Sequence, residues 1–139
     1  MTAENYKDYL TQAFTINRLL RAKQAQIKDL EERRLLISSM TMSSDKVQAG
    51  TNTESFNSLS HEYLDAIDEY MQDEHRLIAL QADIKQLIDS LPKPTHQLIM
   101  TERYINLKRW EDIAADNGYT WKHVHRLHNA ALKALEKRT

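Results

Sequence analysis

The stretch "WEDIAADNGYTWKHVHRLHNAALKAL", residues 110–135, decides the fold of this chain. Its Asn117-Gly118 pair often closes a β-hairpin, but the apolar residues on both sides recur every three or four positions instead of alternating. That spacing is typical of two helices separated by a turn. Gly118 can adopt the positive φ that ends the first helix, and the Thr120 hydroxyl can cap the second. The sequence therefore predicts a short helix over about 109–117, a glycine turn, and a longer helix that begins near Thr120.

Five residues of this stretch satisfy the mechanical needs of a helix-turn-helix motif. The motif needs a small residue where the helices cross, a glycine in the turn, and apolar anchors that fix the second helix. We expect these structural anchors to be Ile113, Ala114, Gly118, Val124 and Leu127. A lead-in helix is predicted over residues 95–106, so that the C-terminal module has three helices.

The composition of the whole chain favours an all-α protein. Only two of the 139 residues are Gly and only two are Pro, while strong helix formers dominate. The chain has no Cys, which excludes disulfides and cysteine-ligated zinc. The N-terminus does not resemble a signal peptide, and no apolar run approaches the ~20 residues that span a bilayer. We therefore expect a soluble protein of the cytoplasm that does not bind a membrane.

Two amphipathic stretches precede the C-terminal module. Apolar residues follow one helical face from Tyr6 to Ile37 and again from about Leu59 to Leu91. The simplest arrangement is a long antiparallel helical hairpin, coiled-coil-like, in which each helix covers the other's apolar face. Ser, Thr and Asn are frequent between the stretches, so we expect a weakly ordered loop over residues 38–58. A homodimer that bundles four such helices would bury the wide second stripe better.

Pro92 and Pro94 interrupt the second stretch and mark a domain boundary. The sequence thus predicts a hairpin or oligomerisation region over 1–91 and a helix-turn-helix module over 92–139. Charge divides at the same place. The first region holds ten Lys and Arg against fifteen Asp and Glu, whereas the second holds nine against five, with four of the six histidines. The basic second region favours an anionic partner, although ordinary variation in surface charge is an alternative.

The longer helix of the motif has the composition expected of a DNA-recognition helix. With Val124 and Leu127 inward, its outer face carries residues that can contact base edges in the major groove. These base-contact candidates are Trp121, Lys122, His125, Arg126 and Asn129. Arg126 can donate twice to guanine and Asn129 can pair with adenine, while protonation of His125 near pH 6 would add positive charge. The phosphate-contact candidates are Lys108, Arg109, His123 and His128.

Residues 110–135 resemble the fourth region of bacterial sigma factors, and "RYINLKRWEDIA", residues 103–114, resembles its lead-in helix. The whole chain is similar to the ArpU/RinA-type late-gene activators of phages of Gram-positive hosts. The resemblance implies a phage or prophage regulator of transcription that binds double-stranded DNA, with host RNA polymerase as a further partner. Nothing resembles the sigma segments that melt promoter DNA, so we do not expect a complete sigma factor.

Other kinds of function receive less support from the sequence. Only His125 and His128 share a helical face, and no third ligand stands near, so no metal site is expected. The chain lacks nucleophile, phosphate-loop and paired-carboxylate motifs, so we expect neither an enzyme nor a cofactor. The main alternative is a sigma-like protein-interaction module that acts on RNA polymerase or another protein without contacting bases.

Overall fold

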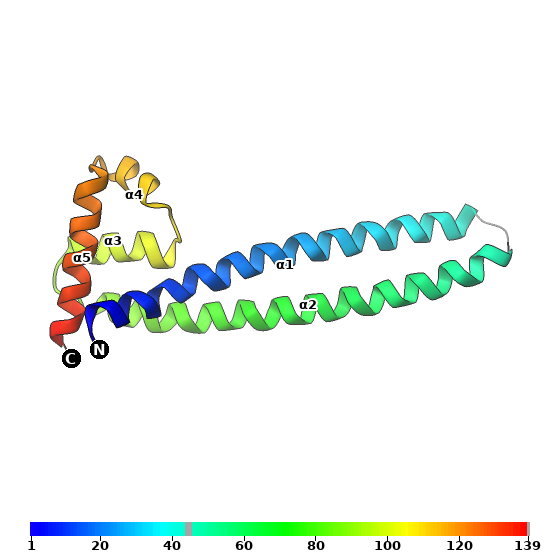
Figure 1. Ribbon diagram of the computed structural model, residues 1–139, viewed down its shortest axis with the longest axis horizontal. Helices are drawn as coiled ribbons and strands as arrows, with labels where there is room; N and C mark the ends of the chain where they lie inside the picture. The colour runs from blue at the N-terminus through cyan, green and yellow to red at the C-terminus, as the bar shows by residue number, and fades with distance from the viewer. Residues whose placement is uncertain (44–45, 139) are drawn as a thin grey trace. The chain divides into compact units, whose positions relative to one another are not determined.

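The computed structural model describes residues 1–43 and 46–138, over which the chain forms helices and no β-strand. In chain order the elements are α1 (Ala3–Ser43), α2 (Lys46–Asp89), α3 (Pro94–Met100), the π-helical turn η1 (Thr101–Ile105), α4 (Trp110–Asn117) and α5 (Trp121–Arg138). α1 and α2 run antiparallel as a hairpin (Figure 1). The prediction of an all-α hairpin followed by three helices is therefore confirmed. No helix of the described residues is long and apolar enough to cross a membrane.

The predicted loop over residues 38–58 is wrong for the described residues. α1 continues to Ser43 and α2 begins at Lys46, so residues 38–43 and 46–58 are helical, while 44 and 45 lie outside the described residues. Contacts between the two helices explain the helical structure near the C-terminal end of α1 and the N-terminal end of α2. The Arg34 Nε atom donates to the Ser60 hydroxyl at 3.0 Å, and the Arg34 guanidinium lies over the Phe56 ring. Such tertiary pairing outweighs the weak helix propensity of Ser, Thr and Asn.

The contacts divide the chain into two compact units. The core unit comprises Met1–Asn17 and Arg76–Thr139, and the hairpin unit comprises Arg18–His75. The division differs from the predicted boundary at residue 92, because the N-terminal part of α1 and the C-terminal part of α2 group with the C-terminal helices. Local sequence signals such as Pro92 and Pro94 do not record which distant segments share a core. The functional division into 1–91 and 92–139 stays a prediction.

The core unit has a continuous apolar interior. Its largest fully buried side chains come from α1, α2, the linker and all the later α-helices, and they are Leu10, Ile84, Leu91, Ile99, Met100, Ile113, Val124 and Leu135. Polar contacts add to this packing. The Gln81 side-chain amide donates to the main-chain carbonyls of Tyr104 and Ile105, at 3.2 and 3.0 Å. The carbonyl groups at the end of η1, which lack partners within the helix, are thereby satisfied by α2.

The turn between α4 and α5 has the predicted geometry. Gly118 has φ 64° and ψ 28°, and the Tyr119 N–H donates to the Ala114 carbonyl at 2.9 Å, which is the Schellman arrangement. The Thr120 hydroxyl accepts a hydrogen bond from the His123 N–H at 3.0 Å and so caps α5. The predicted lead-in helix over 95–106 is present as α3 continued by η1. α4, the turn and α5 thus form a helix–turn–helix unit.

Candidate nucleic-acid interface

The five anchor positions of the motif lie where α3, α4 and α5 meet. Ile113 and Val124 are fully buried and Ala114 nearly so, and they pack with Ile99 of α3. Leu127 is partly buried against the same cluster. This packing holds one side of α5 and determines which of its side chains face outward.

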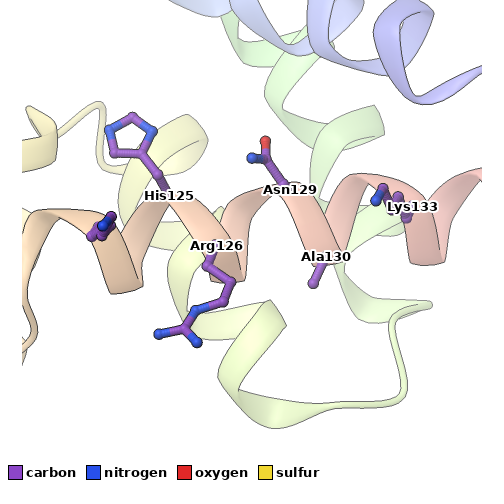
Figure 2. Close-up of a pocket in the computed structure, with 6 residues that line it drawn as sticks. His125, Arg126, Asn129, Ala130 and Lys133 are labelled. Carbon is purple, nitrogen blue, oxygen red and sulfur yellow. The ribbon is translucent and has the colours of Figure 1, made fainter.

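The outward side of α5 forms a shallow basic groove. The groove is lined by Lys122, His125, Arg126, Asn129, Ala130 and Lys133, and Figure 2 labels all but Lys122 along the helix. Lys122, Arg126 and Asn129 are exposed. Within the described part of the chain, Lys122, Arg126 and Lys133 form no ion pair with a carboxylate. Three of the base-contact candidates, Lys122, Arg126 and Asn129, are thus available to a DNA partner.

Arg126 is oriented by a neighbour on its own helix. Its Nη2 atom lies 3.2 Å from the Nδ1 atom of His123, one turn earlier, where the imidazole nitrogen accepts the hydrogen bond. The His123 ring also meets the Tyr119 ring edge-on, with ring centroids 4.9 Å apart. His123 is half-buried in this arrangement. His123 thus contacts the Arg126 side chain through Nδ1, and its role as a phosphate contact stays a prediction.

His125 and Trp121 are less free than the sequence indicated. The His125 ring contacts two indoles, with centroids 3.8 Å from Trp121 and 4.5 Å from Trp110. Burial, then the positive charges of Arg103 and Lys7, lower the pKa of His125 from its ordinary 6.5. The protonation of His125 that the sequence predicts near pH 6 therefore occurs at a lower pH. Trp121 remains 56% exposed, and its free surface can still meet an apolar group.

His128 cannot serve as the predicted phosphate contact in this structure. Its side chain is only 2% exposed, and its Nε2 atom lies 2.7 Å from the Tyr104 hydroxyl in a buried hydrogen bond. Burial and nearby positive groups lower the pKa of His128 to about 4, and burial raises the pKa of Tyr104 to about 12. Burial thus keeps both groups neutral at pH 7, and the pair is part of the interior. The error arose because helical periodicity alone does not reveal the neighbour contributed by η1.

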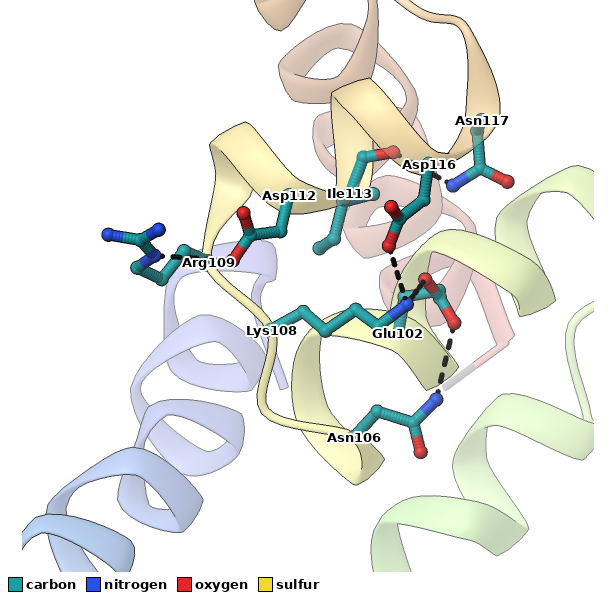
Figure 3. A network of polar contacts seen from close by, with 8 residues as sticks. All are labelled: Glu102, Asn106, Lys108, Arg109, Asp112, Ile113, Asp116 and Asn117. Carbon is teal, nitrogen blue, oxygen red and sulfur yellow. Dashed lines mark hydrogen bonds and ion pairs between the residues drawn. The ribbon is translucent and has the colours of Figure 1, made fainter.

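Lys108 and Arg109 are already engaged by carboxylates, as Figure 3 shows. The Lys108 Nζ atom lies 2.7 Å from Glu102 and 2.9 Å from Asp116, and these two carboxylates raise its pKa. The Arg109 Nε atom lies 3.2 Å from Asp112. A phosphate would have to compete with these partners, so both residues are weaker phosphate contacts than the sequence indicated. The same pairs offset two of the three negative charges beside the motif.

Lys133 was missed by the sequence reasoning, although it lines the basic groove together with Arg126. The signal was available, because steps of three or four residues from Arg126 through Asn129 reach Lys133 and then Lys137 on one helical face. The base-contact candidates end at Asn129 because the N-terminal residues of recognition helices usually make the base contacts.

The chain is a small all-α protein with a helical hairpin and a helix–turn–helix unit. A family model described as "Protein of unknown function (DUF1492)" matches residues 36–136, which is more than half of the chain. The chain therefore belongs to the DUF1492 family. The matched range includes all of α2 to α4 and most of α5, whereas residues 1–35 precede it. Comparisons with curated proteins and with solved structures give no match.

Proposed function

We propose that this protein is a sequence-specific transcriptional regulator that binds duplex DNA with α5 in the major groove. The observation that carries this proposal is the exposed face of α5, where Lys122, Arg126 and Lys133 lie free of carboxylate partners in the described structure. An α-helix fits the major groove of B-DNA, and cations on its outer face gain binding energy by displacing counterions from phosphates. A buried helix–turn–helix core supplies the rigidity that such a contact needs.

Each exposed side chain has a role that follows from its chemistry. Arg126, whose Nη2 atom contacts His123, has further N–H groups that can donate to the O6 and N7 atoms of guanine. Asn129 lies one turn later and can pair with the N6 and N7 atoms of adenine. Lys122 suits guanine or phosphate, and the exposed surface of Trp121 suits a thymine methyl group. The His125 ring contacts the Trp121 indole and can position it.

The carboxylates near the motif support the same role. Glu102, Asp112 and Asp116 would repel DNA if they were unpaired, and their ion pairs with Lys108 and Arg109 reduce three negative charges to a net charge of one. α5 itself carries five basic residues and only one acidic residue, Glu136. The Glu136 side chain accepts a hydrogen bond from the Ala3 N–H at 3.1 Å. Positive potential is therefore concentrated along α5, where a duplex would bind.

The sequence resemblance to sigma region four and to ArpU/RinA-type activators supports a more specific version of the proposal. In that version the protein regulates phage or prophage genes in the cytoplasm of a bacterial host, and host RNA polymerase is a second partner. The role is binding and not catalysis.

We also propose a homodimer, because Leu64 and Met71 are 61% and 50% exposed, seven residues apart on α2. Sedimentation should show a dimer that Leu64→Lys with Met71→Lys converts to a monomer.

The proposal can be tested by selecting bound duplexes from random DNA and measuring affinity by fluorescence anisotropy. The parent should enrich one motif. Arg126→Ala should keep its helical content, lose ~1–3 kcal/mol of binding free energy, and lose preference at one base pair. Lys28→Ala, which removes an exposed lysine of the hairpin unit, is the matched control and should bind as the parent does. If no motif is enriched and Arg126→Ala behaves as the parent, the protein-interaction alternative replaces DNA binding.

A further inference from the structure

A second basic groove lies beside the C-terminal half of α5. It is lined by Pro92, Lys93, His96, Ala130, Lys133, Ala134 and Lys137. Ala130 and Lys133 also line the groove around Arg126, so the two grooves adjoin along α5. Three lysines, two from α5 and one from the linker before α3, therefore meet around one hollow.

The linker holds Lys93 in a defined place. Lys93 stands between Pro92 and Pro94, and its backbone is extended, with φ −95° and ψ 124°. A following proline restricts a residue to that conformation. The preceding Leu91 is buried, and the Gln97 side-chain amide donates to its carbonyl at 2.7 Å. Little backbone freedom remains to be lost when the Lys93 ammonium group meets an anion.

The α5 side of the groove combines charge with open space. Lys133 and Lys137 lie one turn apart, and like charges at that spacing repel each other by a few tenths of a kcal/mol. Ala130 and Ala134 are also one turn apart, and their small side chains leave room for an oxygen-bearing group between the lysines. Within the described part of the chain, none of the three lysines of the groove forms an ion pair with a carboxylate.

His96 adds a buried polar group to the same groove. Its side chain is 6% exposed, and its Nδ1 atom has no hydrogen-bond partner among the described residues. Unsatisfied buried polar atoms are uncommon in folded proteins and often mark a site for a ligand. Burial, followed by the charge of Lys93, lowers the pKa of His96 below its ordinary 6.5. At pH 7 the ring is therefore neutral, and one of its nitrogens carries a hydrogen that can be donated.

We infer that this groove binds a phosphate group, and that the phosphate belongs to the backbone of the DNA bound by α5. Three lysines that line one groove attract an anion such as a phosphate, and His96 offers a further donor. From Arg126 to Lys137 is eleven residues, or about 16 Å along a helix. The major groove is about 12 Å wide, so a helix with Arg126 at the bases brings Lys137 to the phosphates at the edge of the groove. The backbone source rests on the proposed function, whereas the phosphate chemistry does not.

The first experiment measures how the affinity for the selected duplex changes with salt concentration. Lys93→Gln with Lys137→Gln removes two cations that are exposed and outside the apolar core. If Lys93 and Lys137 neutralise the one backbone phosphate in the groove, the slope of log K against log salt should become shallower by about 0.9, since each neutralised phosphate contributes about 0.9. The selected motif should stay the same, because the base contacts are untouched. Circular dichroism checks that the double variant is folded, and Lys28→Gln with Lys85→Gln is the matched control.

The second experiment uses inorganic phosphate and the DNA-free protein. Phosphate should shift the NMR signals of the His96 ring and of Lys93 in the parent, whereas the His96 signals should not shift in Lys93→Gln with Lys137→Gln. If these signals shift while no duplex binds, the groove takes a free phosphate group, and both the backbone source and the proposed function are overturned. If DNA binds with an unchanged slope in the double variant, the site is overturned while the proposed function survives.

Discussion

The core unit and the hairpin unit differ in how completely they bury their apolar side chains. The core unit, Met1–Asn17 with Arg76–Thr139, buries apolar side chains from α1 to α5 around one interior. The hairpin unit, Arg18–His75, has only two helices, and each can cover just one face of the other. Its exposed apolar residues include Leu35 at 64% and Leu64 at 61%. In the core unit, α3 to α5 add a further layer that closes the interior, whereas the two helices of the hairpin unit leave apolar residues open to solvent.

Polar groups also take different roles in the two units. In the hairpin unit the seam between the helices contains a Lys23–Asp73 ion pair and the Arg34–Ser60 hydrogen bond. The Arg34 guanidinium further lies 4.5 Å from the Tyr63 ring centroid. In the core unit the buried polar groups are neutral, as in the Tyr104–His128 pair. A charged seam that remains partly open to water defines the register of two helices, whereas a closed interior excludes charge.

The largest expected effect is the loss of the core unit in Val124→Asp. Val124 is fully buried, so the substitution places an unpaired carboxylate among apolar side chains, at a cost of about 4 kcal/mol or more. Amide hydrogen exchange should show lost protection in α3 to α5 and retained protection in residues 18–40. Lys122→Asp introduces the same group at an exposed position and should leave both units folded. Equal loss of protection in both units would mean that they unfold as one.

The second effect is a dependence of stability on pH that His128 gives to the core unit. The unfolded chain protonates His128 near pH 6.5 and the folded chain only near pH 4, so its contribution is complete above pH 6.5. Between pH 6.5 and 4 the free energy of unfolding should fall by about 3 kcal/mol from this residue. Urea unfolding at pH 7.5 and 4.5 should show a smaller fall in His128→Gln. Part of the fall should persist, since burial also lowers the pKa of His125 and His96. An unchanged fall in the variant would remove His128 as its cause.

A smaller effect is expected at the turn. No atom beyond the neighbouring residues lies within 4 Å of the position that a Cβ atom would occupy at Gly118, so the strain in Gly118→Val comes chiefly from the backbone, whose φ is 64°. A β-branched residue in that conformation should cost about 2 kcal/mol. Gly118→Asn is the matched variant, because Asn tolerates positive φ, and thermal unfolding should place it between the parent and Gly118→Val. Equal stability of all three proteins would show that the turn adopts another conformation in solution.

The smallest effect should come from the seam of the hairpin unit. Lys23→Met leaves the Asp73 carboxylate, which is 6% exposed, without this cation and should lower protection from hydrogen exchange in residues 18–40 and 53–75. Lys23→Met with Asp73→Leu removes both charges and should restore protection to the parent's level or above it. The core unit should keep its protection in both variants. If the double variant is less protected than the single one, the ion pair stabilises the seam by itself.

The sequence alone determined the features that depend on neighbouring residues. Gly118 and Thr120 define the turn between α4 and α5 through local backbone chemistry, and the periodicity of Val124 and Leu127 defines the inner side of α5. The outer side, with Lys122 and Arg126, follows from the same periodicity. These features could be predicted because a helix of known period converts spacing along the chain into direction in space.

Only the tertiary structure decided the features that depend on distant residues. His128 was expected outside, but Tyr104, 24 positions earlier, holds it inside. Lys108 was expected to be free, but Glu102 and Asp116 bind it from both sides. Residues 38–43 and 46–58 were expected to form a loop, but they are helical in the hairpin. Burial and charge pairing depend on which segments the fold brings together, and no local pattern of residues records that choice.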